Sequence, residues 1–148
     1  MIAPTHLDRF LGKIASGAPA LGTVVNLSDP TVTEVFASAG YDFVWIDMEH
    51  TVIDRAAVNQ HILAAASHGA APFVRLAGTD PTLAKPILEM GPAAVVFPFV
   101  NDGEDAVRAV SACRYPPEGV RGFGPQRANR FGGDPLPDYL ERSKREPW

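Results

Sequence analysis

Four short apolar runs alternate with amphipathic stretches between Gly22 and Cys113. Runs that are apolar at nearly every position predict strands buried on both faces, as in a parallel sheet covered by helices. The stretches between them begin with Asp or Asp-Pro, and three of them end at a glycine, which indicates helix caps. We therefore expect strands at 22–27, 42–49, 71–76 and 93–100, and helices at 31–40, 54–69, 80–91 and 102–113.

Four strand–helix units in this order predict an α/β fold, either an open doubly wound sheet or part of a (β/α)8 barrel. A dinucleotide-binding sheet needs Gly-x-Gly-x-x-Gly after its first strand, but this chain reads NLSDPTV there. The stretch GFGPQRANRFGG contains Gly-x-Gly, but it follows the fourth helix and lacks the third glycine at the required spacing. The pattern therefore favours barrel-type units.

The segments before and after this repeating region lack its alternation of strands and helices. Residues 1–21 predict a short amphipathic arm with a helix around Leu7, Phe10 and Ile14. Residues 114–148 are rich in Arg, Gly and Pro and predict a long loop with a charged, frayed helical tail. Loops of this length in compact domains are usually functional or disordered. We expect one partial domain over residues 1–148, with the four units at 22–113.

Composition narrows the class of protein. A hydrophobic content of 46% and a charged content of 20% are ordinary for a globular domain. The net charge of -4 gives no reason to expect nucleic acid or an anionic membrane as a partner. The one cysteine, Cys113, excludes an internal disulfide and fits a reducing cytoplasm. No apolar run approaches the roughly 20 residues that span a bilayer, and no signal peptide is evident.

Polar side chains follow the second and third predicted strands, at the edge where α/β proteins build their active sites. The apolar run of FVWIDMEHT ends in Asp47, Glu49 and His50, and Arg75 closes PFVR. Imidazole titrates near neutral pH, so His50 is the strongest candidate for a general base, with a loop histidine of no role as the alternative. Arg75 is either in a structural ion pair with Asp47 or Glu49, or a fork for a substrate carboxylate or enolate oxygen. Asp47 and Glu49 share one side of the strand and suit orienting Arg75, a water or a metal.

Other titratable residues carry a weaker signal. His61 and His68 lie seven residues apart in a predicted helix, which is not a metal-binding spacing, and we interpret both as surface or packing residues. Glu89, taken alone, is typical of a carboxylate on a helix surface. Three arginines stand in the loop-rich segment: Arg121, Arg127 and Arg130. They either line the access path of an anionic substrate or solvate a loop.

Five stretches together carry a family resemblance: IDMEH, FVRL, ILEMG, VVFPFV and CRYPPEGVRGFGP. From about Leu7 to Gly132 the chain closely resembles the 4-hydroxy-2-oxoheptanedioate aldolases, which are class II pyruvate aldolases of the HpcH/HpaI group related to citrate lyase β-subunits. The resemblance implies a TIM-type (β/α)8 barrel, of which this chain holds about the first four βα units. It also implies a lyase of aromatic-compound catabolism that cleaves 4-hydroxy-2-oxo acids to pyruvate and an aldehyde.

The resemblance also implies roles for individual residues. His50 matches the family's base, which takes the substrate hydroxyl proton, and Arg75 matches the arginine that faces the developing enolate oxygen. Glu89 matches the carboxylate that raises the basicity of the histidine, where many relatives carry Asp. From their positions in the sequence rather than from the resemblance, Asp47 and Glu49 are expected to support the site, and Arg121 is expected to bind substrate.

A divalent metal ion (Mg, Mn or Co) is expected for the family, where it holds the 2-oxo acid and polarises its carbonyl. The family's ligands stand in a Gln-x-Glu motif on strand five and a Gly-Pro-x-Asp-like stretch after strand six, and this sequence contains neither motif. We therefore expect a truncated half barrel without metal ligands. Its first and fourth strands would be open edges, a route to a homo-oligomer. The alternative function is a catalytically inactive half barrel, at most a binding or oligomerising module.

Overall fold

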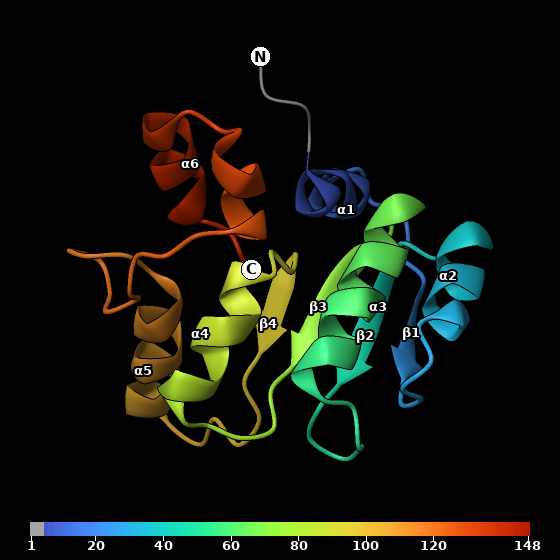
Figure 1. The fold of residues 1–148 in the computed structure, drawn as a ribbon, viewed down its shortest axis with the longest axis horizontal. Helices are drawn as coiled ribbons and strands as arrows, with labels where there is room; N and C mark the ends of the chain where they lie inside the picture. The colour runs from blue at the N-terminus through green and yellow to red at the C-terminus, as the bar shows by residue number, and fades with distance from the viewer. Residues whose placement is uncertain (1–4) are drawn as a thin grey trace.

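The computed structural model describes residues 5–148 and contains one sheet of four parallel strands flanked by helices (Figure 1). The strands are β1 Gly22–Val25, β2 Phe43–Asp47, β3 Ala71–Arg75 and β4 Ala94–Val96, in the order β1-β2-β3-β4. Four helices follow them in turn: α2 Thr31–Ser38, α3 Arg55–Ser67, α4 Pro81–Glu89 and α5 Gly103–Cys113. This is the α/β order that the sequence predicts.

Local sequence sets where the helices begin and end. Three aspartates accept a hydrogen bond from a backbone N–H in the first turn of the next helix: Asp54, Asp80 and Asp102. Gly91 follows α4 with a φ of 73°, a conformation that side chains disfavour. At α2 the cap differs from the expectation, because Pro30 itself is the N-cap and Asp29 accepts from the backbone of Thr31. β4 ends at Val96, several residues before the predicted position.

The main core lies between the sheet and its helices. Val44, Ile46 and Val74 of the strands pack with Ile62 and Leu88 of the helices, and none of these side chains is more than 2% exposed. A second cluster lies under α1 (His6–Ala15), which crosses the edge where the strands begin (Figure 1). Residues 1–4 of the predicted N-terminal arm lie outside the described residues.

One polar pair lies inside the main core. Thr33 of α2 and His61 of α3 are both 0% exposed, and the Thr33 hydroxyl is 2.8 Å from Nδ1 of His61. Burial lowers the pKa of His61, so the neutral ring is the favoured form. His68 lies at the helix end, 3.5 Å from Glu34. His61 is therefore a packing residue that joins two helices.

The C-terminal segment is folded, although its sequence predicts a loop and a frayed tail. It contains the 3-10 helix η1 (Arg127–Gly132) and the helix α6 (Leu136–Ser143). At the chain end, the backbone N–H of Trp148 donates to the Ala93 carbonyl, and the Val95 N–H donates to the Trp148 carbonyl, both at 3.0 Å. The outer edge of β4 is therefore partly covered, and the expectation of an open edge holds there only in part.

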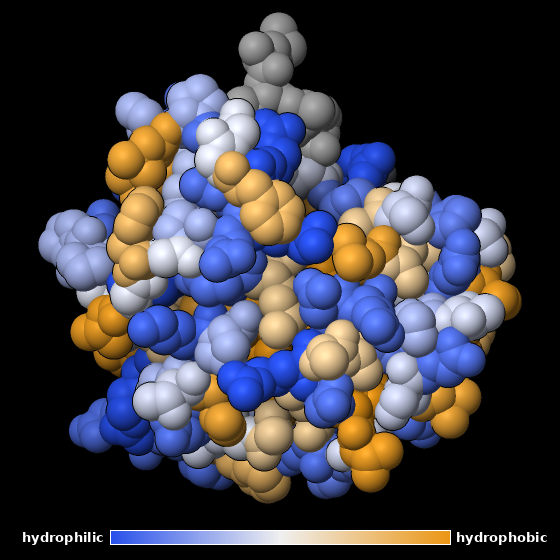
Figure 2. Space-filling view, in the orientation of Figure 1, coloured by the Kyte–Doolittle hydropathy of each residue, from blue (hydrophilic) through white to orange (hydrophobic). Residues whose placement is uncertain are grey.

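On the face shown in Figure 2, exposed apolar side chains stand in separate patches between polar residues. Within residues 5–148, no helix has both the length and the apolar character to cross a membrane.

Candidate functional site

The candidate site lies at the carboxyl ends of β2 and β3. Parallel pairing sets Asp47, the last residue of β2, beside Arg75, the last residue of β3. Arg75 Nε donates to Asp47 Oδ1 at 3.0 Å, and Arg75 Nη2 donates to Oδ2 at 2.5 Å. This two-point hydrogen bonding from Arg75 lowers the pKa of Asp47 and raises that of Arg75. Both groups are therefore charged at neutral pH.

Glu49 and His50 extend this pair into a row of four side chains, which we call the Asp47–His50 row. Arg75 Nη1 lies 3.0 Å from Glu49 Oε2, and His50 Nε2 lies 3.6 Å from the same oxygen. The side chain of Glu49 is 8% exposed, whereas that of His50 is 69% exposed. Asp47 Oδ1 also accepts from the backbone N–H groups of Glu49 at 2.8 Å and His50 at 3.4 Å. The Asp47 carboxylate therefore fixes the turn that carries His50.

The row combines an accessible imidazole with directed N–H donors. The Glu49 carboxylate lies within ion-pair distance of the His50 ring, on the side that Arg75 also contacts. Arg75 has five N–H donors, of which two are hydrogen-bonded to Asp47, while its Nη1 atom forms an ion pair with Glu49. The remaining donors of this guanidinium, whose side chain is 25% exposed, can reach an anionic oxygen.

The sequence predicted that these side chains lie close together, but it did not predict which backbone segment places Glu49 beside Arg75. Asp47 and Glu49 were expected on one side of an extended strand, yet β2 ends at Asp47. Glu49 reaches Arg75 from the turn that follows, whose backbone hydrogen bonds to Asp47. Arg75 thus forms ion pairs with both Asp47 and Glu49, and a structural ion pair was one of the two alternatives that the sequence left open for it. Its role in binding an anion stays a prediction.

The structure does not bring Glu89 to this row. Glu89 is the last residue of α4 and precedes β4, so it lies at the edge where the strands begin, opposite to His50. There Arg121 Nη2 is 3.2 Å from Glu89 Oε1 and 3.4 Å from the Leu88 carbonyl oxygen. The carboxylate beside His50 is Glu49. The catalytic role of Glu89 and the substrate-binding role of Arg121 stay predictions without support from contacts in this chain.

The described side chains do not by themselves form a metal site. Residues 5–148 contain no group of three or more His, Cys, Asp or Glu side chains that could hold a metal ion. Asp47 and Glu49, the two carboxylates of the Asp47–His50 row, are both paired with Arg75. The positive charge of that guanidinium opposes a cation at the same oxygens.

Several known proteins are similar to this chain in sequence, and they point to one family. The family model for HpcH/HpaI aldolase/citrate lyase matches residues 21–143. The hydroxypyruvate/pyruvate aldolase of Paraburkholderia phytofirmans is 36% identical over 140 residues, which are 95% of this chain and 52% of that protein. The 5-keto-4-deoxy-D-glucarate aldolase of Citrobacter koseri is 36% identical over 139 residues, 93% of this chain and 53% of that protein. The chain spans about half the length of these curated relatives.

Solved structures agree with this match. An HpcH/HpaI aldolase/citrate lyase family protein from Burkholderia cenocepacia J2315 superposes with a TM-score of 0.78 at 34% identity, over 85% of this chain and 51% of that one. An HpcH/HpaI aldolase from Desulfitobacterium hafniense DCB-2 gives 0.81 at 25% identity, over 90% and 52%. These TIM-barrel neighbours confirm the predicted barrel-type fold. Because the family model covers residues 21–143 and the sequence and structure comparisons agree with it, the chain belongs to the HpcH/HpaI aldolase/citrate lyase family.

Proposed function

We propose that this chain promotes aldol cleavage of a 4-hydroxy-2-oxo acid to pyruvate and an aldehyde. The observation that carries the proposal is the Asp47–His50 row at the carboxyl ends of two barrel strands, in a member of an aldolase and lyase family. Relatives named for hydroxypyruvate, pyruvate and a keto-deoxy sugar acid support a 2-oxo acid as the substrate class. These names do not favour the alternative of an inactive binding module.

His50 is the base of the proposed reaction. Its exposed imidazole takes the proton of the substrate's C4 hydroxyl while the C3–C4 bond breaks, which releases C4 as the aldehyde. The electron pair of that bond passes to the C2–C3 unit and forms the enolate of pyruvate. Protonation at C3 completes pyruvate, and the imidazolium beside Glu49 supplies or relays that proton.

Arg75 is the proposed contact for the substrate carboxylate or the enolate oxygen. Asp47 and Glu49 already offset its positive charge. The contact therefore depends on directed N–H donors more than on net charge, as in an oxyanion hole. Asp47 acts as a positioning residue, because it holds the guanidinium at two points and also anchors the turn that carries His50.

Three further expectations from the sequence accompany this proposal. A divalent ion (Mg, Mn or Co), which the family resemblance implies, is one, but the described residues supply no ligand set for it. A homo-oligomer is the second, and a cytoplasmic location is the third. Each stays a prediction for this chain.

A coupled assay tests the proposal. Pyruvate release from a 4-hydroxy-2-oxo acid is followed with lactate dehydrogenase and NADH, with and without Mn²⁺. We expect turnover that falls by about 10²-fold or more in His50→Ala, the usual contribution of a general base. His68→Ala is the matched control, because this histidine sits at the end of α3 and pairs with Glu34. The inactive-module alternative predicts no turnover in the wild type either, with pyruvate binding at most. Turnover that His50→Ala leaves intact would remove His50 from the mechanism.

A further inference from the structure

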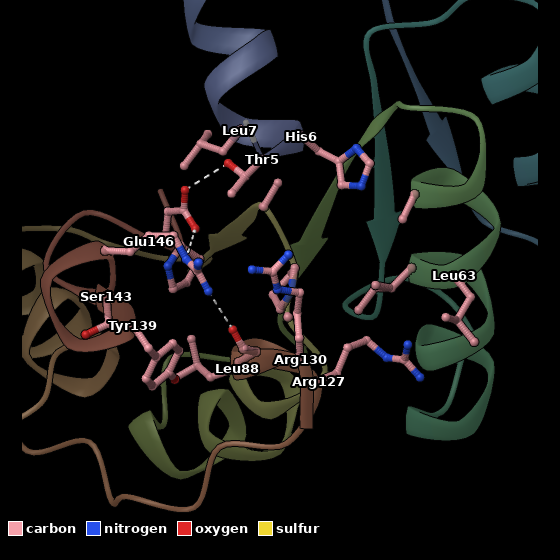
Figure 3. Close-up of a pocket in the computed structure, with 18 of the residues that line it drawn as sticks. Thr5, His6, Leu7, Leu63, Leu88, Arg127, Arg130, Tyr139, Ser143 and Glu146 are labelled. Atoms are coloured by element: carbon pink, nitrogen blue, oxygen red, sulfur yellow. Dashed lines mark hydrogen bonds and ion pairs between the residues drawn. The ribbon is translucent and has the colours of Figure 1, made fainter. Parts of the chain in front are cut away.

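A cavity of about 360 Å³ opens at the edge of the sheet opposite to the Asp47–His50 row. It lies between α1, α3, the turn before β4 and the C-terminal segment (Figure 3). Leu7, Ile62 and Leu88 contribute to its apolar wall. Four arginines also line it: Arg121, Arg127, Arg130 and Arg142.

The middle of the face in Figure 2 is hollowed, with apolar atoms at depth between hydrophilic residues. This volume lies in the range of pockets that hold small ligands.

Three carboxylates pair with three of the four guanidinium groups. The pairs are Glu89 with Arg121, the buried Asp134 with both Arg130 and Arg142, and Glu146 with Arg142. Arg127 is different, because no carboxylate in residues 5–148 lies within ion-pair distance of it. It lies over the ring of Phe131 at 5.3 Å and extends toward Leu63 of α3 across one side of the cavity (Figure 3). The cavity therefore has one positive charge in excess.

Two guanidinium donors beside the cavity have no partner. The Nε atoms of Arg121 and Arg127 are both buried without a hydrogen bond to the protein. The Arg121 side chain is 2% exposed, and all its hydrogen bonds to protein use Nη2. Buried polar groups in native proteins are nearly always satisfied. Oε2 of Glu89, which pairs with Arg121 through Oε1, is likewise buried without a partner. The two Nε–H groups lie behind the cavity surface, and an anionic oxygen reaches them once the guanidinium groups turn toward the cavity.

We propose that this cavity binds a small organic monocarboxylate, at a site separate from the Asp47–His50 row. A single excess positive charge matches one carboxylate better than a phosphate dianion. Glu146, itself a lining residue, adds repulsion against a second negative charge. The apolar wall takes the short carbon chain of the ligand, which inorganic anions lack. Arg127 and Arg121 donate to the carboxylate oxygens, as guanidinium groups commonly do.

Calorimetric titration of the full chain with sodium hexanoate, and separately with inorganic phosphate, tests this site at constant ionic strength. Arg127→Gln removes the one lining guanidinium that is in no ion pair, so it leaves no carboxylate unpaired. We expect it to weaken hexanoate binding at least about tenfold, or about 1.4 kcal/mol. Arg108→Gln is the matched control: it makes the same charge change on the exposed side of α5, where Arg108 is 57% exposed. The affinity of the Arg108→Gln protein for hexanoate should match that of the wild type.

A second variant tests the cavity without changing charge. Ala66→Leu adds bulk to the α3 wall, where Ala66 lines the cavity, and should also weaken hexanoate binding. Three results would each overturn the proposal: no saturation by hexanoate up to about 10 mM, equal losses in Arg127→Gln and Arg108→Gln, or phosphate binding that depends on Arg127 while hexanoate does not bind. His50→Ala should bind hexanoate like the wild type. A negative aldolase assay therefore does not count against the carboxylate site, and absence of hexanoate binding does not count against the proposed aldolase activity.

Discussion

Replacing Asp47 with asparagine tests whether the Asp47–Arg75 pair holds the candidate site together. Asp47→Asn keeps the shape of the side chain but removes the charge that meets Nε and Nη2 of Arg75. The two side chains are only 7% and 25% exposed, so water screens the pair poorly. Breaking a buried pair by removing one partner costs about 3–5 kcal/mol. Glu49, 3.0 Å from Nη1 of Arg75, offsets part of this, and we expect a loss of about 2–3 kcal/mol.

Urea unfolding followed by tryptophan fluorescence measures this loss. Trp45 is a local reporter, because its ring centroid lies 5.8 Å from the guanidinium carbon of Arg75. A loss of this size also lowers Tm by roughly 4–12 °C in a domain of this length. The matched control is Glu104→Gln, which removes a carboxylate from an exposed pair with Arg108, whose side chains are 88% and 57% exposed. Its free energy of unfolding should change by less than about 0.5 kcal/mol.

The result that would refute this reasoning is an Asp47→Asn protein as stable as the Glu104→Gln control. The Asp47–Arg75 pair would then contribute no more than a surface ion pair. A double-mutant cycle with Arg75→Gln adds a stricter test, since residues in contact should couple by at least about 1 kcal/mol. Strictly additive losses would mean that the hydrogen-bonded geometry carries no interaction energy.

Two further predictions concern the core and the sheet edge. Burial lowers the pKa of His61 below its usual 6.5, so the unfolded chain binds a proton first as the pH falls. The stability that His61 contributes is present above pH 6.5 and is lost below it until the folded ring also protonates. His61→Gln should therefore flatten the pH dependence of the urea midpoint below pH 6.5. A slope equal to that of the wild type would contradict this role of His61. Deleting Trp148 removes its backbone hydrogen bonds to Val95 of β4 and to Ala93, just before β4, and its ring contact with Phe10. We expect stability to fall by about 2 kcal/mol and self-association to rise in sedimentation velocity as the β4 edge opens; no change in either would contradict the role of Trp148 at this edge.

The candidate site could be predicted as far as strand register determines it. Asp47 and Arg75 end neighbouring parallel strands, so their meeting follows from the order of the apolar runs. The contact of Glu49 with Arg75 does not follow from that order, because it depends on a turn built after β2 has ended. The link between Glu89 and His50 came from resemblance alone. The alternation of strands and helices places these two residues at opposite edges of the sheet.

The fold of the C-terminal segment could not be predicted from its composition. Gly, Pro and Arg indicate a loop, but the segment is held by contacts between residues far apart in sequence. The hydroxyls of Tyr115 and Tyr139 lie 2.7 Å apart, and the Arg121 guanidinium lies 4.6 Å from the centre of the Tyr115 ring. The buried Asp134 accepts from two arginines. No local pattern reports such pairings, although the amphipathic stretch LPDYLERS did carry a helix signal.

The two edges of the sheet differ in charge, and this difference sets conditions on both proposals. The Asp47–His50 row has two carboxylates to one guanidinium, whereas the cavity has four guanidinium groups to three carboxylates. The five residues of β2 separate the edges by roughly 17 Å, about twice the Debye length at physiological salt. Solvent ions therefore weaken the field of one edge for an anion that approaches the other edge through water. An anionic substrate gains little from the overall charge of the row and must be held by the directed donors of Arg75, while a carboxylate entering the cavity meets an attractive field from the start.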